Sequence, residues 1–392
     1  MKALCYNGRN DLRVERVPDP EIVSPQDIIL RVIMSSVCGS DLHLLNGYVP
    51  TMQEGDIIGH EFMGEVVEVG SEVKKLKRGD RVVVGSVLGC GECSFCQTES
   101  WSLCDNSNPN AYMVEPLYGY APAGIFGYSH AFGGYAGSHA EYIRVPFADK
   151  GSFLIPEGVS DESAVFCSDA FPTGFMGADM AGIQPGDTVA VWGCGAVGQM
   201  AIRSAYLLGA ERVIAMDRHQ HLLNQAKTNS KAEVLSIDDV DIQEALREMT
   251  GGRGPDRCID AVGMEAVSSS PQYYYDKAKQ WVRLENDRPI VLREAIKACR
   301  KGGTISIIGV YGGFVDKIPM GAAMNKALTF RMGQMHAQKY IPRLLDYLAK
   351  GDVDTSDLLT YKMPLEQGQH GYDLFNSKSN NTMRVVFTPQ AA

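Results

Sequence analysis

Residues 188–198 read TVAVWGCGAVG, an apolar run that leads into three spaced glycines. This order predicts a strand that turns directly into a helix, which is the context in which G-x-G-x-x-G indicates a dinucleotide site. Gly193 allows the tight turn, Gly195 lets the backbone approach a pyrophosphate, and Gly198 lets the helix pack on the strand. A glycine-rich helix start without any ligand is the alternative reading of the same residues.

The expected cofactor contacts extend beyond these glycines. Ala196 and Val197 begin the predicted helix, so its amides and its dipole face the phosphates. Asp217 lies 19 residues beyond Gly198, at the end of the next predicted strand. A carboxylate there accepts hydrogen bonds from the adenosine ribose and repels a 2′-phosphate, which favours NAD over NADP. Arg218 weakens this preference, because an arginine can accommodate that phosphate.

Around this turn, short apolar runs alternate with amphipathic segments, which is typical of parallel βαβ units. The predicted strands are 188–192, 212–216, 234–237, 256–262, 303–310 and 328–333. The predicted helices are 196–208, 220–229, 241–249 and 290–300. The pattern therefore predicts a doubly wound α/β domain.

Residues 1–147 show a different pattern of apolar and turn residues. Short β-like runs punctuated by Gly and Pro predict a barrel-like β domain, with strands at 1–6, 12–17, 27–34, 62–70, 80–87 and 139–147. Helical pieces broken near Pro172 follow, so a domain boundary is expected near 165–175. A helix at 340–350 and a strand at 383–387 are expected near the C-terminus, with a return to the first domain near 335.

Composition narrows the function classes. Of 392 residues, 37 are Lys or Arg and 47 are Asp or Glu, so the net charge is −10 and nucleic acid is excluded as the main partner. The N-terminus lacks an apolar signal region, and no uncharged apolar stretch of about 18 residues suggests a membrane span. We therefore expect a cytoplasmic protein whose ten cysteines are ligands or buried residues rather than disulfides.

Four cysteines are closely spaced in a loop-like segment. Cys90, Cys93, Cys96 and Cys104 lie within 15 residues of one another. Four thiolates can close a tetrahedron around zinc, and such a site has no open position for a substrate. The spacing therefore predicts a structural zinc site, with a chance cluster of buried cysteines as the alternative.

Other residues with suitable chemistry are scattered along the chain. Cys38 follows a predicted strand, His60 and Glu61 are adjacent, and Asp169 precedes a proline by three residues. Each also has an ordinary structural explanation: a core cysteine, a satisfied polar group or a turn residue. Composition and spacing alone do not bring them together.

In combination, the motifs resemble the zinc-dependent medium-chain alcohol dehydrogenases. CGSDLH at 38–43, GDIIGHEFMGEVVEVGSEV at 55–73, the four-cysteine segment and GCGAVG occur in the order of that family. The resemblance covers essentially the whole chain. It implies a GroES-like β-barrel catalytic domain at 1–170, completed by 337–392, and a Rossmann NAD-binding domain at 171–336. The active site is then expected in the cleft between them.

Within that superfamily, the sequence is most similar to the glutathione-independent formaldehyde dehydrogenase type. Asp169 in SDAFPTG stands where many relatives have Cys, and Gly39 replaces a common basic residue. Extra residues also occur at about 264–288. The resemblance further implies a homo-oligomer, specifically a tetramer.

The resemblance also assigns ligands for a second, catalytic zinc ion. Cys38 matches the thiolate ligand, His60 the imidazole ligand and Asp169 the third protein ligand. Glu61 matches a carboxylate that lies beside the zinc or ligates it in relatives. Asp41 matches the residue that orients His60.

Three further residues receive roles in the same way. Ser40 matches the hydroxyl that hydrogen-bonds the substrate oxygen, and His43 matches the outer end of the proton relay. Arg384 resembles a C-terminal arginine that binds the cofactor pyrophosphate. Cys167, two residues before the ligand position, is expected only to pack in the core.

These residue types suit hydride transfer between an alcohol and NAD. Three protein ligands leave one exchangeable position on zinc, and a carboxylate ligand makes the ion a stronger Lewis acid than a thiolate would. Hydrated formaldehyde is a geminal diol, so the same site can oxidise it to formate. The alternatives are a polyol, secondary-alcohol or S-hydroxymethylglutathione dehydrogenase, and a non-catalytic NAD-binding sensor. Every catalytic position is filled, which disfavours the sensor.

The extra stretch at 264–288 is rich in aromatic and basic residues, among them Tyr273, Tyr274, Tyr275, Trp281, Arg283 and Arg288. It follows a strand whose C-terminal end should face the cofactor crevice. A subunit contact or a plain surface excursion is one interpretation. The other is that the stretch covers the adenosine end of the dinucleotide and slows its release, as an insertion does in the formaldehyde dehydrogenases that the chain resembles.

If the second interpretation is right, the purified protein retains NAD through exhaustive dialysis. Denaturing the dialysed protein and assaying the supernatant for NAD(H) is then expected to find about one equivalent per chain. Retention would favour alternating oxidation and reduction of aldehydes without cofactor exchange. Substoichiometric cofactor with full dependence on added NAD would instead indicate an ordinary exchanging dehydrogenase.

Overall fold

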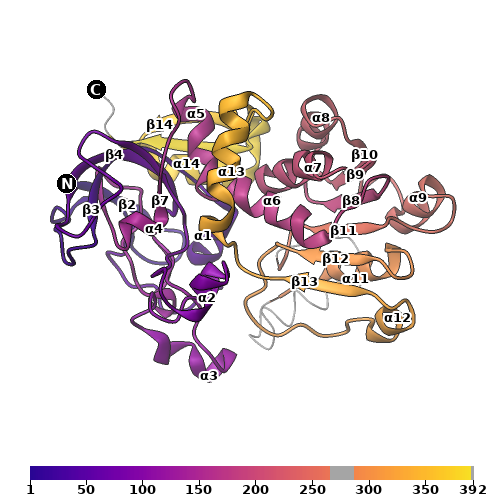
Figure 1. The fold of residues 1–392 in the computed structure, drawn as a ribbon. Coiled ribbons are helices and arrows are strands. Elements are labelled where there is room, and N and C mark those ends of the chain that lie inside the picture. Colours follow the sequence, from indigo (N-terminus) through magenta and orange to yellow (C-terminus); the bar gives the residue numbers. More distant parts are fainter. Residues whose placement is uncertain (265–286, 390–392) are drawn as a thin grey trace. The chain divides into compact units, whose positions relative to one another are not determined.

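The computed structural model of the chain describes residues 1–264 and 287–389. It divides into two compact units (Figure 1). The first unit comprises Met1–Pro172 and Met335–Ala392, and the second comprises Thr173–Gln334.

The second unit is built on a six-stranded sheet in which every pairing is parallel. Its strand order is β10-β9-β8-β11-β12-β13, which is the 3-2-1-4-5-6 order of a doubly wound Rossmann sheet. The strands are β8 (Thr188–Trp192), β9 (Arg212–Asp217), β10 (Glu233–Ser236), β11 (Arg257–Asp260), β12 (Thr304–Ile307) and β13 (Thr329–Met332). The helices are α7 (Ala196–Leu207), α8 (Gln220–Asn229), α9 (Ile242–Met249), α11 (Ile290–Ala298) and α12 (Met320–Asn325). The expected doubly wound α/β fold is confirmed.

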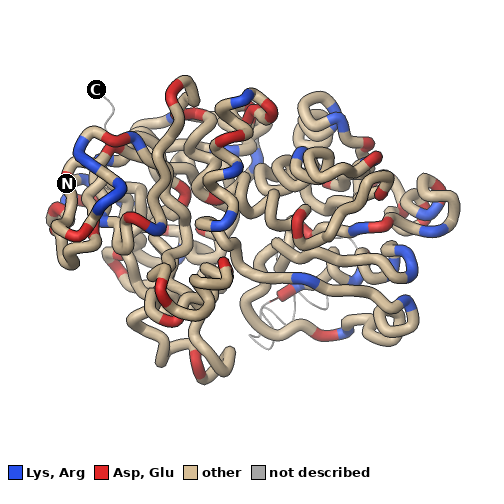
Figure 2. Tube along the Cα trace, viewed as in Figure 1, with Lys and Arg blue, Asp and Glu red and all other residues tan. Residues whose placement is uncertain are grey.

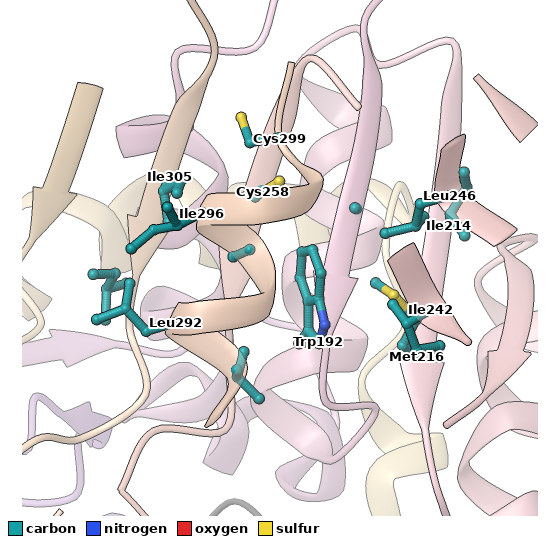
Figure 3. Close-up of a cluster of buried hydrophobic side chains, with 14 of the residues drawn as sticks. Trp192, Ile214, Met216, Ile242, Leu246, Cys258, Leu292, Ile296, Cys299 and Ile305 are labelled. Carbon is teal, nitrogen blue, oxygen red and sulfur yellow. The ribbon is translucent and has the colours of Figure 1, made fainter. Parts of the chain in front are cut away.

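The core of this unit explains why its strands read as continuous apolar runs. Parallel strands covered by helices are buried on both faces, and four of the five β8 residues are buried. Figure 3 shows Trp192 at the end of β8, between Ile296 of α11 and Met216 of β9. Its indole nitrogen donates to Glu294 at 3.1 Å, so the large ring is buried without leaving an unsatisfied donor.

The three glycines after β8 are each required for a different reason. Gly193 has φ +92°, and a Cβ there would lie 2.8 Å from Val262 after β11. A Cβ on Gly198 would lie 1.9 Å from the Gly193 carbonyl oxygen, so only glycine lets α7 start this close to the turn. A Cβ on Gly195 would meet nothing within 4 Å, which leaves open space over the first turn of the helix.

The first unit is mainly antiparallel. A seven-stranded sheet has the order β14-β15-β3-β4-β5-β7, with β6 paired to β3, and β1 pairs with β2. The strands are β1 (Lys2–Tyr6), β2 (Leu12–Arg16), β3 (Ile28–Ser36), β4 (Glu61–Val69), β5 (Arg81–Val84), β6 (Tyr142–Val145), β7 (Ser152–Leu154), β14 (Leu359–Pro364) and β15 (Arg384–Thr388). The helices are α1 (Gly39–Leu45), α2 (Ser94–Gln97), α3 (Glu115–Tyr118), α4 (Ala148–Gly151), α5 (Asp161–Ala164), α13 (Ala337–Lys350) and α14 (Gly368–Ser377), while α6 (Ala170–Ala181) runs across the unit boundary.

Several of these elements were not predicted. α1 begins with Gly and Ser and has only seven residues, so its helical period is too short to recognise. α14 and β14 also went unrecognised, although the β14 backbone pairs in parallel with β15. Pro172 lies in the first turn of α6, where its missing amide hydrogen breaks no helical hydrogen bond.

The described residues that flank the extra stretch are hydrogen-bonded to each other. The Arg288 amide donates to the Met264 carbonyl at 3.1 Å, and the Met264 amide donates to Val310 at 2.8 Å. Residues 265–286, which include the aromatic residues discussed above, lie outside the described part of the chain.

The distribution of charged residues and the lengths of the apolar helices agree with the expectations from composition. Figure 2 shows acidic and basic residues interspersed along both units, without a long run of one sign. Among the described residues, no helix is long and apolar enough to span a membrane.

The contact at Gly198 makes a stability prediction. Gly198→Ala would force α7 away from the turn, so we expect it to destabilise the second unit by about 3 kcal/mol. The matched variant Gly195→Ala places its methyl group in open space and should change stability by less than about 1 kcal/mol. Urea unfolding of both variants measures the difference, and equal midpoints would show that the Gly193–Gly198 contact is not close in solution.

Candidate active site

The four spaced cysteines converge in the first unit. Their sulfur atoms all lie within 4.8 Å of one another. The Cys90–Cys96 and Cys93–Cys104 sulfur pairs are 4.0 Å and 3.9 Å apart. Zinc–sulfur bonds of roughly 2.3 Å require edges of about 3.8 Å in a tetrahedron, so the donor set fits zinc.

Backbone amides prepare one of these sulfurs to be a thiolate. Cys90 Sγ accepts hydrogen bonds from the amides of Glu92 and Cys93 and from the Asn106 side chain, each at 3.4 Å. Burial alone would raise the pKa of Cys90, but these donors lower it to about 7. The turn around Cys90 therefore favours the charge state that binds metal.

A second donor set lies in the same unit and joins residues far apart in sequence. Cys38 ends the turn after β3, His60 precedes β4, and Asp169 precedes α6. One ligand atom from each lies within 4.8 Å of the other two. The Asp169 Oδ2 atom is 3.4 Å from Cys38 Sγ and 3.8 Å from His60 Nε2, close to the edges of about 3.4–3.6 Å in a zinc tetrahedron. Three donors of these types fit a catalytic zinc.

Neighbouring residues orient each of the three donors. Asp41 contacts His60 Nδ1 at 3.0 Å and also accepts the Cys38 amide at 2.8 Å, where it caps α1. Burial opposes its charge, yet His60 lowers the pKa of Asp41. Ser86 donates to the Oδ1 atom of Asp169 at 3.2 Å, which leaves Oδ2 directed at the other ligands. The imidazole thus presents Nε2 to the centre of the site.

The predicted hydroxyl and relay residues both lie on α1. Ser40 Oγ is 3.2 Å from His60 Nε2 and 3.5 Å from Cys38 Sγ. His43 is three residues further on, a spacing that places both side chains on one helix face. Its role as the outer end of a proton relay stays a prediction.

Glu61 and Arg384 form a buried pair behind the donor set. The Glu61 carboxylate is 3.2 Å from the Arg384 guanidinium and also accepts the Ala170 amide at 3.0 Å. Burial raises the pKa of Glu61 to about 7, although Arg384 opposes the rise. Arg384 also donates to the Val37 carbonyl and is only 2% exposed, while its Nε atom has no hydrogen-bond partner among the described residues. Its predicted contact with a pyrophosphate stays a prediction.

The predicted cofactor residues of the second unit gather at the end of β9. Asp217 accepts the amides of Cys194 and His219 at 2.8 Å and 2.9 Å, which ties the glycine turn to this strand. Arg218 is paired with Asp238 at 2.9 Å. The guanidinium that could have neutralised a 2′-phosphate is therefore already engaged by a carboxylate.

Two residues near the donor set were missed from the sequence. Ser86 follows β5 and holds Asp169, and Tyr128 lies edge-on to His60 with ring centroids 6.2 Å apart. Burial raises the pKa of Tyr128 far above its usual range, so the ring contributes a neutral apolar wall. No motif surrounds either residue, so a single sequence carries no signal for them.

The two donor sets predict two zinc ions that differ in lability. We expect elemental analysis to find two zincs per chain, because each set fits a tetrahedral ion. Cys38→Ser and Cys104→Ser should each lose one of them. A mild chelator should remove the ion of the Cys38 set first, since that set leaves one position for an exchangeable ligand. One zinc or none in carefully purified protein would contradict this.

Known families match both units. Residues 24–156 match the alcohol dehydrogenase GroES-like domain, and residues 196–279 match the zinc-binding dehydrogenase domain. The first unit is therefore GroES-like, as expected from the motifs.

Whole-chain relatives agree with these matches. The Bacillus subtilis uncharacterized zinc-type alcohol dehydrogenase-like protein AdhB is 42% identical over 392 residues, which covers 99% of this chain and 100% of that protein. The glutathione-independent formaldehyde dehydrogenase of Bacillus subtilis is 31% identical, with 96% and 94% covered. The solved structure of alcohol dehydrogenase TADH from Thermus sp. ATN1 is similar with a TM-score of 0.83 at 31% identity, and 99% of each chain is covered. The chain therefore belongs to the zinc-dependent alcohol dehydrogenases of the medium-chain superfamily and is an oxidoreductase of that family.

Proposed function

We propose that the protein transfers a hydride between NAD and a small alcohol or aldehyde hydrate, with hydrated formaldehyde as the favoured substrate class. The observation that carries this proposal is the convergence of Cys38, His60 and Asp169 within 4.8 Å, with the Ser40 hydroxyl beside them. A donor set of three leaves one position at zinc for a substrate oxygen.

Cys38, His60 and Asp169 would hold a zinc ion that supplies Lewis acidity at the substrate oxygen, and bound NAD would supply the hydride acceptor. Residues of the chain itself would accept the proton of the substrate hydroxyl and pass it on. Ser40 lies close enough to both Cys38 and His60 to hydrogen-bond an oxygen held at the same centre. His43, one turn further along α1, would pass the proton outward.

The cofactor preference rests on the end of β9. Two backbone amides hold the Asp217 carboxylate at the end of β9, where the adenosine ribose is expected. The Arg218 guanidinium is paired with the Asp238 carboxylate at 2.9 Å, which offsets its positive charge. Both features support NAD rather than NADP.

The substrate class rests on the ligand set and on the relatives. An aspartate as third ligand is the feature that the sequence shares with the formaldehyde dehydrogenase type, and one such enzyme is 31% identical. Hydrated formaldehyde carries two hydroxyls on one carbon, so it presents the same C–H and O–H bonds as an alcohol. The name of the 42% identical Bacillus subtilis protein mentions alcohol dehydrogenase and no aldehyde. Simple alcohols are therefore the second candidate substrate class.

A steady-state screen tests this proposal directly. Formaldehyde, primary alcohols, secondary alcohols, polyols and formaldehyde with glutathione are compared by kcat/KM, each with NAD and with NADP. We expect the highest kcat/KM with NAD and formaldehyde, without a gain on adding glutathione. A preference for polyols, or an absolute need for glutathione, would reject the substrate class and leave the family unchanged.

His60→Ala should abolish turnover because it removes a zinc ligand. NAD binding, followed by fluorescence or calorimetry, should stay within about three-fold of the parent protein, since the glycine turn lies in the other unit. His370→Ala, which changes an exposed histidine on α14, serves as the control and should keep full activity. Near-normal turnover in the His60 variant would place the active site elsewhere.

Asp217→Asn tests the cofactor preference. Asparagine keeps a carbonyl oxygen for one of the two amides but removes the charge that repels a 2′-phosphate. We expect the ratio of kcat/KM for NADP over NAD to rise about ten-fold, which corresponds to about 1.4 kcal/mol. Asp239→Asn changes an exposed acid nearby and should leave the ratio unchanged. An unchanged ratio in the Asp217 variant would mean that this carboxylate is not at the ribose.

A further inference from the structure

A fully buried carboxylate lies at the carboxyl end of β11, in the middle of the parallel sheet. It belongs to Asp260, the last residue of this strand. Its Oδ1 atom accepts the backbone amides of Val262 and Gly263 at 2.9 Å and 3.0 Å. Its Oδ2 atom accepts the hydroxyl of Tyr311, which follows β12, at 2.8 Å. A buried carboxylate is costly unless such donors replace its hydration, so the native fold needs all three contacts.

The segments that follow β11 and β12 are pressed together at this point. The main-chain oxygen of Asp260 accepts the amide of Gly309 at 2.8 Å. A Cβ added to Gly309 would lie 2.2 Å from the nitrogen of Gly263, and one added to Gly263 would lie 2.5 Å from the nitrogen of Val310. No side chain fits between the two segments, so a shift of one of them must move the other.

The segment after β11 also packs against the glycine turn. The Ala261 amide donates to the Trp192 carbonyl at 3.0 Å. A Cβ added to Gly193 would lie 2.8 Å from a Val262 methyl group. The strand order of a doubly wound sheet reverses between its first and fourth strands, which are β8 and β11 here, and dinucleotides bind at that point. The backbone that Asp260 holds is therefore next to the expected cofactor position.

The position in the sheet indicates which part of the cofactor is concerned. Each half of a doubly wound sheet binds one half of a dinucleotide. The half formed by β8, β9 and β10 carries the glycine turn and Asp217, where the adenosine ribose is expected. The half formed by β11, β12 and β13 is then the one that takes the nicotinamide mononucleotide. Asp260 and Tyr311 both belong to this second half.

We propose that Asp260 and Tyr311 are positioning residues for the nicotinamide half of the cofactor. They act through the backbone that they hold after β11 and β12. A surface that is already ordered binds more tightly, because association does not have to supply the cost of ordering it. Burial and the neighbouring carboxylate raise the pKa of Tyr311 far above its usual range, so the phenol keeps the proton that it donates. The inference rests on the proposed use of NAD and does not depend on the proposed substrate.

One variant and one matched control separate this role from general stability. Tyr311→Phe keeps the ring and removes only the hydroxyl that Asp260 accepts. Tyr206→Phe is the control, because it removes a hydrogen bond of 3.0 Å to the Lys231 carbonyl in the same unit. Tyr206 is near the end of α7 and Lys231 precedes β10, so this bond lies at the amino edge of the sheet, away from the expected cofactor position.

The first measurement compares the dissociation constants of NAD and AMP by calorimetry, on protein freed of any retained cofactor. We expect Tyr311→Phe to weaken NAD binding about ten-fold and to leave AMP binding within about two-fold, since AMP lacks the nicotinamide half. Tyr206→Phe should leave both constants unchanged. An equal loss for NAD and AMP would indicate a general loosening of the unit, and unchanged NAD binding would leave Tyr311 as a stabilising residue only. Either result would overturn the proposal.

The second measurement needs no ligand. Amide hydrogen exchange at Val262 and Gly263 should be about ten-fold faster in Tyr311→Phe than in the parent and in Tyr206→Phe, because the carboxylate that holds these amides has lost one donor. Unchanged exchange at both amides would overturn the proposal. A parent protein that binds neither NAD nor AMP would instead reject the proposed cofactor, so the two failures are distinguishable.

Discussion

The pairing of β3 with β4 is the constraint on which the active site depends. In this antiparallel register Ser36 lies opposite Glu61, so Cys38 and His60 emerge at the same end of the sheet. β15 pairs with the other side of β3, which brings Arg384 to the same end. A slip of one residue would turn every side chain of a strand to the opposite face. The metal site and the hydrophobic core therefore require the same register.

Charge balance is the second requirement of this buried region. The thiolate of Cys38 and the carboxylate of Asp169 would balance the two charges of a bound zinc ion, and Arg384 lies 3.2 Å from Glu61 and 3.9 Å from Cys38 Sγ. Burying charged groups costs several kcal/mol for each ion, and losing one partner leaves that cost uncompensated. The charges of the metal ligands and of the Glu61–Arg384 pair therefore depend on one another, in addition to their shared geometry.

The parts of the structure that were predictable are those encoded by local pattern. The spacing from Cys90 to Cys104 and the glycine turn at Gly193 bring their residues together within one short segment, and the alternating segments of the second unit are confirmed as a parallel sheet. Cys38 and Asp169 are 131 residues apart, and only the family resemblance suggested that they meet. Ser86 was missed because its role comes from a hydrogen bond to Asp169, 83 positions away. Short strands and helices of the first unit were missed for the same reason, since their partners rather than their own sequence stabilise them.

The hydrogen bond between Met264 and Arg288 makes the arrangement of the Rossmann sheet independent of the number of residues between them. Because these two residues are hydrogen-bonded at 3.1 Å, β11 and α11 are joined at a fixed point whatever lies between them. The entropy of closing a loop grows only slowly, by about 0.6 kcal/mol for each doubling of its length. Evolution can therefore lengthen, shorten or exchange this segment as a module, and the strand order of the Rossmann sheet stays the same.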